Sequence, residues 1–267
     1  MTTMGANRGS IASLLRFGGR SMGSANIRKD MLFSTESETL GNAAKDFRYL
    51  LDRRYPRKQA LELVGNRYQL SADQRHLLHR AVFSREEALL RRKKRVSLQK
   101  LRDRLLAIDG HNVIITIEAY LEGRPLILGD DGFIRDISGR SRNFRPSKRT
   151  TEALRLILDL LRRAKPSKIL FLFDGPISRS GELAREARER MEKESLPGEA
   201  LAVPVPERIL LGFRGVVATS DTAIIDRCAE IFDLAGSIIR GERKRGVTAS
   251  RSGFRPRTQK ALTTPEG

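Results

Sequence analysis

The sequence predicts an α/β fold with a parallel sheet, preceded by a small all-helical domain. From residue 105 onward, short apolar runs alternate with segments of helical periodicity, which is typical of a parallel sheet covered by helices. Between residues 41 and 83, apolar residues recur at helical spacing instead. We therefore expect five segments: a disordered basic extension (1–40), a helical domain (41–83), a basic helical linker (84–104), the α/β domain (105–240) and a disordered basic tail (241–267).

Lys and Arg outnumber Asp and Glu by 51 to 32, which gives the 267-residue chain a formal net charge of +19. This charge favours a polyanionic partner, nucleic acid before an anionic membrane surface. The alternative is an ordinary soluble protein with basic, disordered ends. No apolar run reaches the roughly 18–20 residues of a membrane span, so we expect no membrane partner. The single cysteine, Cys228, excludes an internal disulfide and a thiolate zinc site, and it fits a reducing, cytoplasmic location.

The first 40 residues are rich in Ser and Arg, and their acids come only near the end. This composition fits an organelle presequence, but its periodic part is short, so we favour a disordered extension or an unused upstream start. In the helical domain, Pro56 ends the first helix and Ser71 caps the third. His76 and His79 on that third helix could be two metal ligands. No further ligand is near them in the sequence, so we favour a structural role.

Two basic segments are candidates for contact with nucleic acid. The side chains that we predict to bind the phosphate backbone lie in the linker and in the loop at 138–149: Arg92, Lys93, Lys94, Arg140, Arg142, Arg145 and Lys148. Each contact with a phosphate would release counterions and add salt dependence to binding. The alternatives are a solvated helix face for the linker and a mobile loop without function.

The α/β part divides into elements by its turn residues and its periodicity. Asp-Gly between two apolar runs predicts a hairpin over 126–136. The other predicted strands lie at 105–109, 169–174, 216–221 and 237–239, with an edge strand or loop at 200–205. The predicted helices lie at 112–122, 150–166, 180–193 and 222–235.

Three of the predicted strands end in an acid, namely Asp109, Asp174 and Asp221. The carboxyl ends of parallel strands meet at one edge of a sheet, where open α/β sheets bind ligands. Clustered carboxylates repel one another unless a cation lies among them, and hard oxygen ligands suit Mg²⁺ or Mn²⁺. We therefore predict a site for one of these ions, with the three acids as catalytic residues and ligands. Asp226 is a weaker fourth ligand, because five helical steps turn it away from Asp221.

Other polar residues near these acids have more than one interpretation. Glu118 and Glu152 could supply a fourth acid, although Glu152 fits a helix-dipole role better. Asn112 could orient its loop, bind a phosphate or cap its helix. His111 could act as a general base or phosphate contact, or it could serve only in the turn. Ser220 could cap the helix that begins near residue 222.

No phosphate-binding loop, dinucleotide-binding motif or nucleophile elbow occurs in the sequence. The acidic segments resemble the signature of PIN-like and NYN-type nuclease domains: Ile-Asp-Gly-His-Asn at 108–112, Phe-Asp-Gly at 173–175 and Thr-Ser-Asp at 219–221. Residues 46–239, with Tyr-Pro-Arg at 55–57 and Leu-Val-Gly-Asn-Arg-Tyr at 63–68, are similar to an uncharacterised prokaryotic family that joins a small helical domain to a PIN-like domain. The resemblance implies a parallel α/β sheet, a Mg²⁺ or Mn²⁺ site and cleavage of RNA.

We therefore expect a metal-dependent ribonuclease, or a related phosphodiesterase that acts on RNA, in which the three acids hold the cation that activates water. The alternative is a non-catalytic RNA-binding or ribosome-associated protein that retains a degenerate PIN-like fold. A third hypothesis is an antitoxin-like or scaffolding protein that binds a protein partner through the helical domain. Steep loss of RNA affinity with salt is expected of the first two only.

Overall fold

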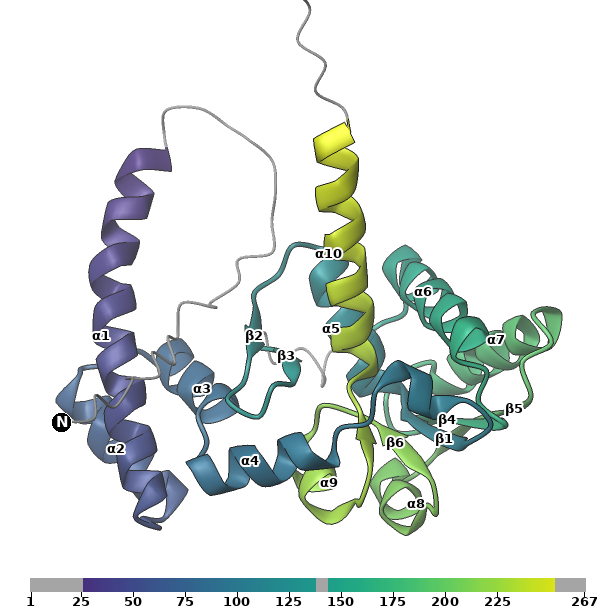
Figure 1. Cartoon of the computed structure of the whole chain (residues 1–267), viewed down its shortest axis with the longest axis horizontal. Helices are drawn as coiled ribbons and strands as arrows, with labels where there is room; N and C mark the ends of the chain where they lie inside the picture. The colour runs from purple at the N-terminus through teal and green to yellow at the C-terminus, as the bar shows by residue number, and fades with distance from the viewer. Residues whose placement is uncertain (1–25, 138–143, 253–267) are drawn as a thin grey trace, which may run out of the picture.

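The computed structural model describes residues 26–137 and 144–252 of the chain (Figure 1). The predicted nucleic-acid contacts Arg140 and Arg142 lie outside these residues, as do most of the basic extension and part of the tail. None of the helices within the described residues combines the length and the hydropathy that crossing a bilayer requires.

Four helices form the first part of the described chain, which we call the helical region. They are α1 (Asn26–Asp52), α2 (Arg57–Arg67), α3 (Ala72–Ala81) and α4 (Arg85–Lys94). Capping boxes begin α3 and α4, so the predicted cap at Ser71 is confirmed and Ser84 plays the same role for α4. Apolar side chains on the facing sides of α1, α2 and α3 form one buried cluster. The region begins before residue 41, because α1 begins at Asn26.

The α/β prediction is confirmed by a five-stranded parallel sheet in the order β5-β4-β1-β6-β7. Its strands are β1 (Leu105–Asp109), β4 (Lys168–Asp174), β5 (Gly198–Val203), β6 (Val216–Ala218) and β7 (Ile231–Phe232). The central strand β1 alternates its side chains between two cores, as a strand period of two requires. Leu106 and Ile108 belong to one core and Ala107 to the other.

Helices cover both faces of the sheet. One core contains side chains from α5 (Gly110–Leu121), α6 (Lys148–Ala164), α7 (Ser180–Lys193) and α10 (Leu234–Ser252). The opposite core contains side chains from the shorter helices α8 (Pro206–Gly212) and α9 (Thr222–Arg227). A short 3-10 turn (Leu98–Leu101) connects α4 to β1 and packs its Leu101 under α6. The sheet is therefore the middle of three layers.

The chain after Asp221 differs from the prediction. The expected helix at 222–235 ends at Arg227, and Ile231–Phe232 form the edge strand β7. The run at 237–239 that we predicted as a strand lies in α10. Asp233 explains this difference, because its carboxylate accepts a hydrogen bond from the Gly236 backbone amide at 3.1 Å and begins the helix. The same helix reaches Ser252, so the first half of the predicted disordered tail is helical.

The predicted hairpin is confirmed as the antiparallel pair β2 (Leu126–Leu128) and β3 (Ile134–Asp136). It lies between α3 and α5 in Figure 1. Ile127 is buried in the cluster of the helical region, whereas Leu126 and Ile134 pack with Ile239 of α10. The hairpin therefore packs on the helical region through one strand face and on α10 through the other, and ties the helical region to the α/β part.

A buried ionic network reinforces this connection. Asp131, at the hairpin turn, has no exposed surface, and Arg135 of β3 pairs with both of its oxygens at 2.8 and 2.6 Å. The third nitrogen of the Arg135 guanidinium donates to the Ser220 carbonyl at 2.8 Å. Arg91 of α4 lies 3.5 Å from Asp131 and also forms a two-pronged ion pair with Asp226 of α9, at 2.6 and 2.8 Å. These bonds connect α4, the hairpin and the loop before α9.

Replacement of Arg135 by Met should destabilise the fold strongly. The variant leaves the Asp131 carboxylate buried without its main partner, and breaking a buried pair in this way costs about 3–5 kcal/mol. Denaturant unfolding measures the loss. Arg155→Met is the matched control, because Arg155 pairs with Asp159 at the surface and its loss should cost less than about 1 kcal/mol. Equal effects of the two variants would contradict the structural role of Arg135.

Candidate functional site

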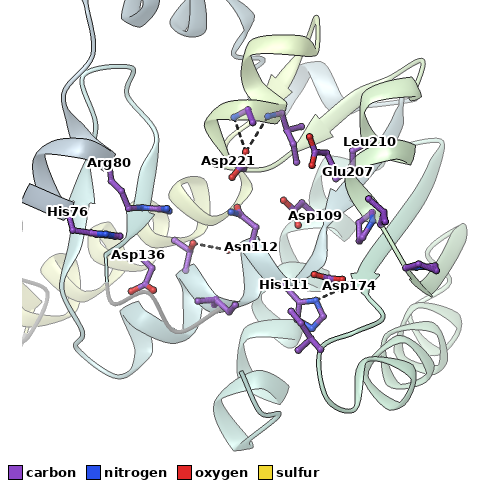
Figure 2. Close-up of a pocket in the computed structure, with 18 residues that line it drawn as sticks. His76, Arg80, Asp109, His111, Asn112, Asp136, Asp174, Glu207, Leu210 and Asp221 are labelled. Carbon is purple, nitrogen blue, oxygen red and sulfur yellow. Dashed lines mark hydrogen bonds between the residues drawn. The ribbon is translucent and has the colours of Figure 1, made fainter. Parts of the chain in front are cut away.

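The three strand-end acids line one cavity of about 580 Å³, which we call the acidic cavity (Figure 2). Asp109 is the last residue of β1, Asp174 is the last residue of β4, and Asp221 follows β6 immediately before α9. They meet because β4, β1 and β6 are adjacent and parallel, so their carboxyl ends share one edge of the sheet. This edge is the ligand-binding position of open α/β sheets.

Asp109 lies at the centre of this edge. Its carboxylate accepts a hydrogen bond from the Thr219 hydroxyl at 2.8 Å. Burial raises the pKa of Asp109 from 3.8 to about 7, and the negative charges of Asp221 and Asp174 act in the same direction. The hydrogen bond from Thr219 opposes this shift only partly. The site therefore contains a carboxyl group that resists ionisation.

Asp221 is held by the helix that follows it. Its carboxylate Oδ1 accepts from the backbone amides of Ala223 and Ile224, at 2.8 and 3.3 Å, so Asp221 is the N-cap of α9. The prediction that Ser220 caps this helix is wrong, because Ser220 is used elsewhere. Its backbone amide and hydroxyl both donate to the Asn112 side-chain oxygen, at 2.9 and 3.0 Å.

Asn112 therefore orients the loop that carries Asp221, one of the three roles that its position allowed. It lies in the first turn of α5, but it is not the cap of that helix, since Asp109 occupies the cap position. Asn112 also lines the acidic cavity, so contact with a phosphate remains a prediction. Gly110 between them is required by close packing, because a Cβ there would lie 2.6 Å from the Phe173 ring.

His111 positions Asp174. Its Nδ1 accepts a hydrogen bond from the Asp174 backbone amide at 3.0 Å, so the proton of the neutral ring is on Nε2. The ring packs edge-on against Phe144 and Phe173, and burial lowers its pKa to about 4. Such a low pKa makes His111 a weak proton acceptor at neutral pH and favours the structural interpretation over the general base.

The opposite wall of the cavity comes from outside the sheet. His76 and Arg80 extend from α3, and Asp136 from the end of β3. The sequence allows His76 to be a metal ligand together with His79 and favours a structural role for it, but nothing in the sequence singles out Arg80. The available signal was their spacing of four, which puts both on one face of a helix, but no pattern indicated what that face would meet.

Asp226 does not line the cavity, so the structure does not bring it to the predicted metal site. Asp226 instead pairs with Arg91, because α9 turns this side chain toward α4. The other candidate acids are also elsewhere. Glu118 accepts a hydrogen bond from Thr150 in the core, and Glu152 pairs with Arg149 on the surface.

The predicted basic contacts have different surroundings. Arg92 and Lys93 are exposed on α4, as are Arg145 and Lys148 near the start of α6. Lys94 is half-buried and donates to the backbone carbonyls of Ile225 and Asp226 at the end of α9, so part of its role is structural.

Within the described residues, no group of three His, Cys, Asp or Glu side chains is arranged to hold a metal ion. The acids of the cavity nevertheless act on one another, since Asp221 and Asp174 both raise the pKa of Asp109. Their donor set consists of hard oxygen atoms. Mg²⁺ takes one or two carboxylates from a protein and keeps several water molecules, so these residues fit a hydrated ion between them.

Comparisons with known proteins agree with the two-part organisation. The model of the family described as "Domain of unknown function (DUF5616)" matches residues 98–237, and that described as "Protein of unknown function (DUF434)" matches residues 39–94. The chain is 33% identical over 187 residues to "Uncharacterized protein MJ0935" of Methanocaldococcus jannaschii, a match that covers 70% of this chain and 89% of that protein. No solved structure matches the chain.

Replacement of Asp109 by Asn should change how stability depends on pH. Between pH 3.8 and about 7, the folded protein keeps a proton that the unfolded chain has released, so the free energy of unfolding of the wild type falls as the pH rises. The Asp109→Asn variant has no carboxyl group to ionise at this position, so its free energy of unfolding does not fall for this reason as the pH rises. We expect it to gain about 2–4 kcal/mol over the wild type between pH 4 and pH 8 in metal-free buffer, where partial exposure of Asp109 limits the gain.

Denaturant unfolding across this pH range measures the difference. Asp159→Asn, at an exposed surface pair, is the control and should follow the wild type. A constant difference between Asp109→Asn and the wild type at every pH would contradict the raised pKa.

Proposed function

We propose that this chain, which belongs to the family described as "Domain of unknown function (DUF5616)", hydrolyses phosphodiester bonds in RNA with Mg²⁺ or Mn²⁺ as cofactor. The observation that carries the proposal is the convergence of Asp109, Asp174 and Asp221 on one cavity, where their mutual repulsion contributes to the raised pKa of Asp109. A divalent cation relieves such repulsion. Bound there, it would supply Lewis acidity to a phosphate and lower the pKa of a coordinated water.

The chain's own residues hold this site in place. Thr219 orients the Asp109 carboxylate, and Asn112 fixes the loop of Asp221 through Ser220. His111 fixes the backbone at Asp174. Each acid is thus held through its own carboxylate or through the neighbouring backbone, so little reorganisation is needed when a cation binds. The resemblance to PIN-like nucleases supports the same reaction.

RNA as the substrate is supported by charge. The net charge of +19 favours a polyanion, and Arg92, Lys93, Arg145 and Lys148 are exposed for contact with a backbone. The alternative, an RNA-binding protein without catalysis, is favoured by one observation: the described residues contain no preformed group of three metal ligands.

Addition of Mn²⁺ should stabilise the wild type against thermal unfolding. A ligand that binds only the folded state at about 100 times its dissociation constant adds about 2.7 kcal/mol to the free energy of unfolding. Asp109→Asn removes the central carboxylate and should abolish most of this shift, whereas Asp159→Asn should retain it. Equal shifts in all three proteins would place the ion outside the acidic cavity.

Cleavage of labelled single-stranded and structured RNAs tests the activity itself. The wild type should cleave with Mg²⁺ or Mn²⁺ and not with EDTA, while Asp109→Asn should lose about 100- to 1,000-fold in rate, since a metal contributes several kcal/mol to the transition state. Asp159→Asn should cleave like the wild type. Tight, salt-sensitive RNA binding without cleavage in either metal would instead establish the binding protein.

A further inference from the structure

Arg80 lines the acidic cavity, and no ion pair or hydrogen bond within the described residues accounts for its positive charge there. It extends from α3, in the helical region, toward the edge of the sheet where Asp109 and Asp221 lie (Figure 2). Desolvation and the charge of Arg135 lower the pKa of Arg80, and the negative charges of Asp221 and Asp136 oppose that shift. Yet Arg80 forms no ion pair with them within 4.0 Å among the described side chains.

Arg80 is half-buried, and its bonding differs from that of the buried arginines Arg91 and Arg135. Its Nε is buried and has no hydrogen-bond partner in the described part of the protein. Arg91 and Arg135, in contrast, each have two-pronged carboxylate partners. The buried Nε has lost its hydration without gaining a partner among the described residues, which costs stability, so packing alone does not account for Arg80. An anion that enters the cavity would supply the missing partner.

A phosphate group is the anion that this environment fits. The arginine fork binds two phosphate oxygens at once, with a geometry that lysine does not offer. The charge balance of the site explains why a positive side chain such as Arg80 is needed for a phosphate to bind there. Three ionised carboxylates and one divalent cation leave a net negative charge, which repels a phosphodiester unless a positive side chain faces it.

The fold holds Arg80 at a defined position relative to the acids. Leu77, Leu78 and Ala81 of α3 are buried in the same cluster as Ile127 of the hairpin. The hairpin is connected in turn to the loop of Asp221 by the Arg135–Ser220 hydrogen bond. Arg80 and Asp221 are thus both held in place by the hairpin, although they belong to segments matched by two different families.

We infer that Arg80 binds a phosphate group of the substrate opposite the three acids, so that the helical region and the α/β part form one composite site. The inference rests on the proposed function only for the identity of the substrate as RNA. Hydrolysis itself is not required for it.

The test compares Arg80→Met, Arg80→Lys and the control Arg85→Met in the full chain. Arg85 is 86% exposed and does not line the acidic cavity, so its replacement removes the same charge from the helical region without touching the site. Affinity for a short labelled RNA is measured by fluorescence anisotropy over a series of salt concentrations, with Ca²⁺ in place of Mg²⁺ or Mn²⁺ to limit turnover while the acids keep a cation. Thermal unfolding of each variant is measured beside it.

We expect Arg80→Met to weaken RNA binding about 10-fold and to reduce the salt slope by about one unit, with Arg80→Lys between it and the wild type. Arg85→Met should bind within about twofold of the wild type. The thermal midpoint of Arg80→Met should be unchanged or higher, because the charge that is removed is half-buried and has no ion-pair partner among the described residues. A lower midpoint, or RNA affinity equal to that of the control, would overturn the inference.

These outcomes separate the inference from the proposed reaction. Weakened binding by Arg80→Met in a protein that never cleaves RNA supports the phosphate site and rejects hydrolysis. Cleavage by Arg80→Met with the KM and kcat of the wild type supports hydrolysis and rejects the role of Arg80. A wild type that binds no RNA rejects both.

Discussion

The buried carboxylate of Asp131 is the constraint on which the arrangement of this protein depends. A charge without exposed surface must be paired, and Arg135 supplies both bonds while Arg91 lies nearby. Because Arg135 also binds the Ser220 carbonyl, neutralising one acid of the hairpin determines the position of the loop that carries another, Asp221. The network is thus a geometric connection between the helical region and the sheet edge, more than a source of net stability.

Through this connection, the acidic cavity has one wall with negative side chains and another wall with a positive side chain. The sheet edge presents three carboxylates, of which Asp109 resists ionisation because it is desolvated and close to like charges. The helical wall presents Arg80, whose guanidinium is partly desolvated and whose buried Nε has no partner within the described residues. His111 beside them stays neutral, since burial depresses its pKa. A cation and a phosphate bound together would satisfy both walls, which neither would do alone.

Much of the fold and part of the site could be predicted from local patterns. The alternation of apolar runs and helical periods predicted the parallel sheet, and Asp-Gly predicted the hairpin, because backbone geometry determines both patterns. The run at 237–239 was misassigned because β-branched residues favour strands, whereas the cap at Asp233 starts a helix there. Asp226 was wrongly assigned to the metal site, because its position in a helix gives the direction of its side chain relative to Asp221 but not the residue that it contacts, which is Arg91.

The shared edge of Asp109, Asp174 and Asp221 could be inferred from local patterns, since acids at the ends of adjacent parallel strands converge. Tertiary packing alone brings Arg80 of α3 to face them, lets Asn112 hold Ser220 and pairs Asp226 with Arg91. These contacts could not be predicted because they join residues far apart in the chain. Their partners follow from how helices pack against the hairpin and the sheet, and periodicity within one segment carries no information on that packing.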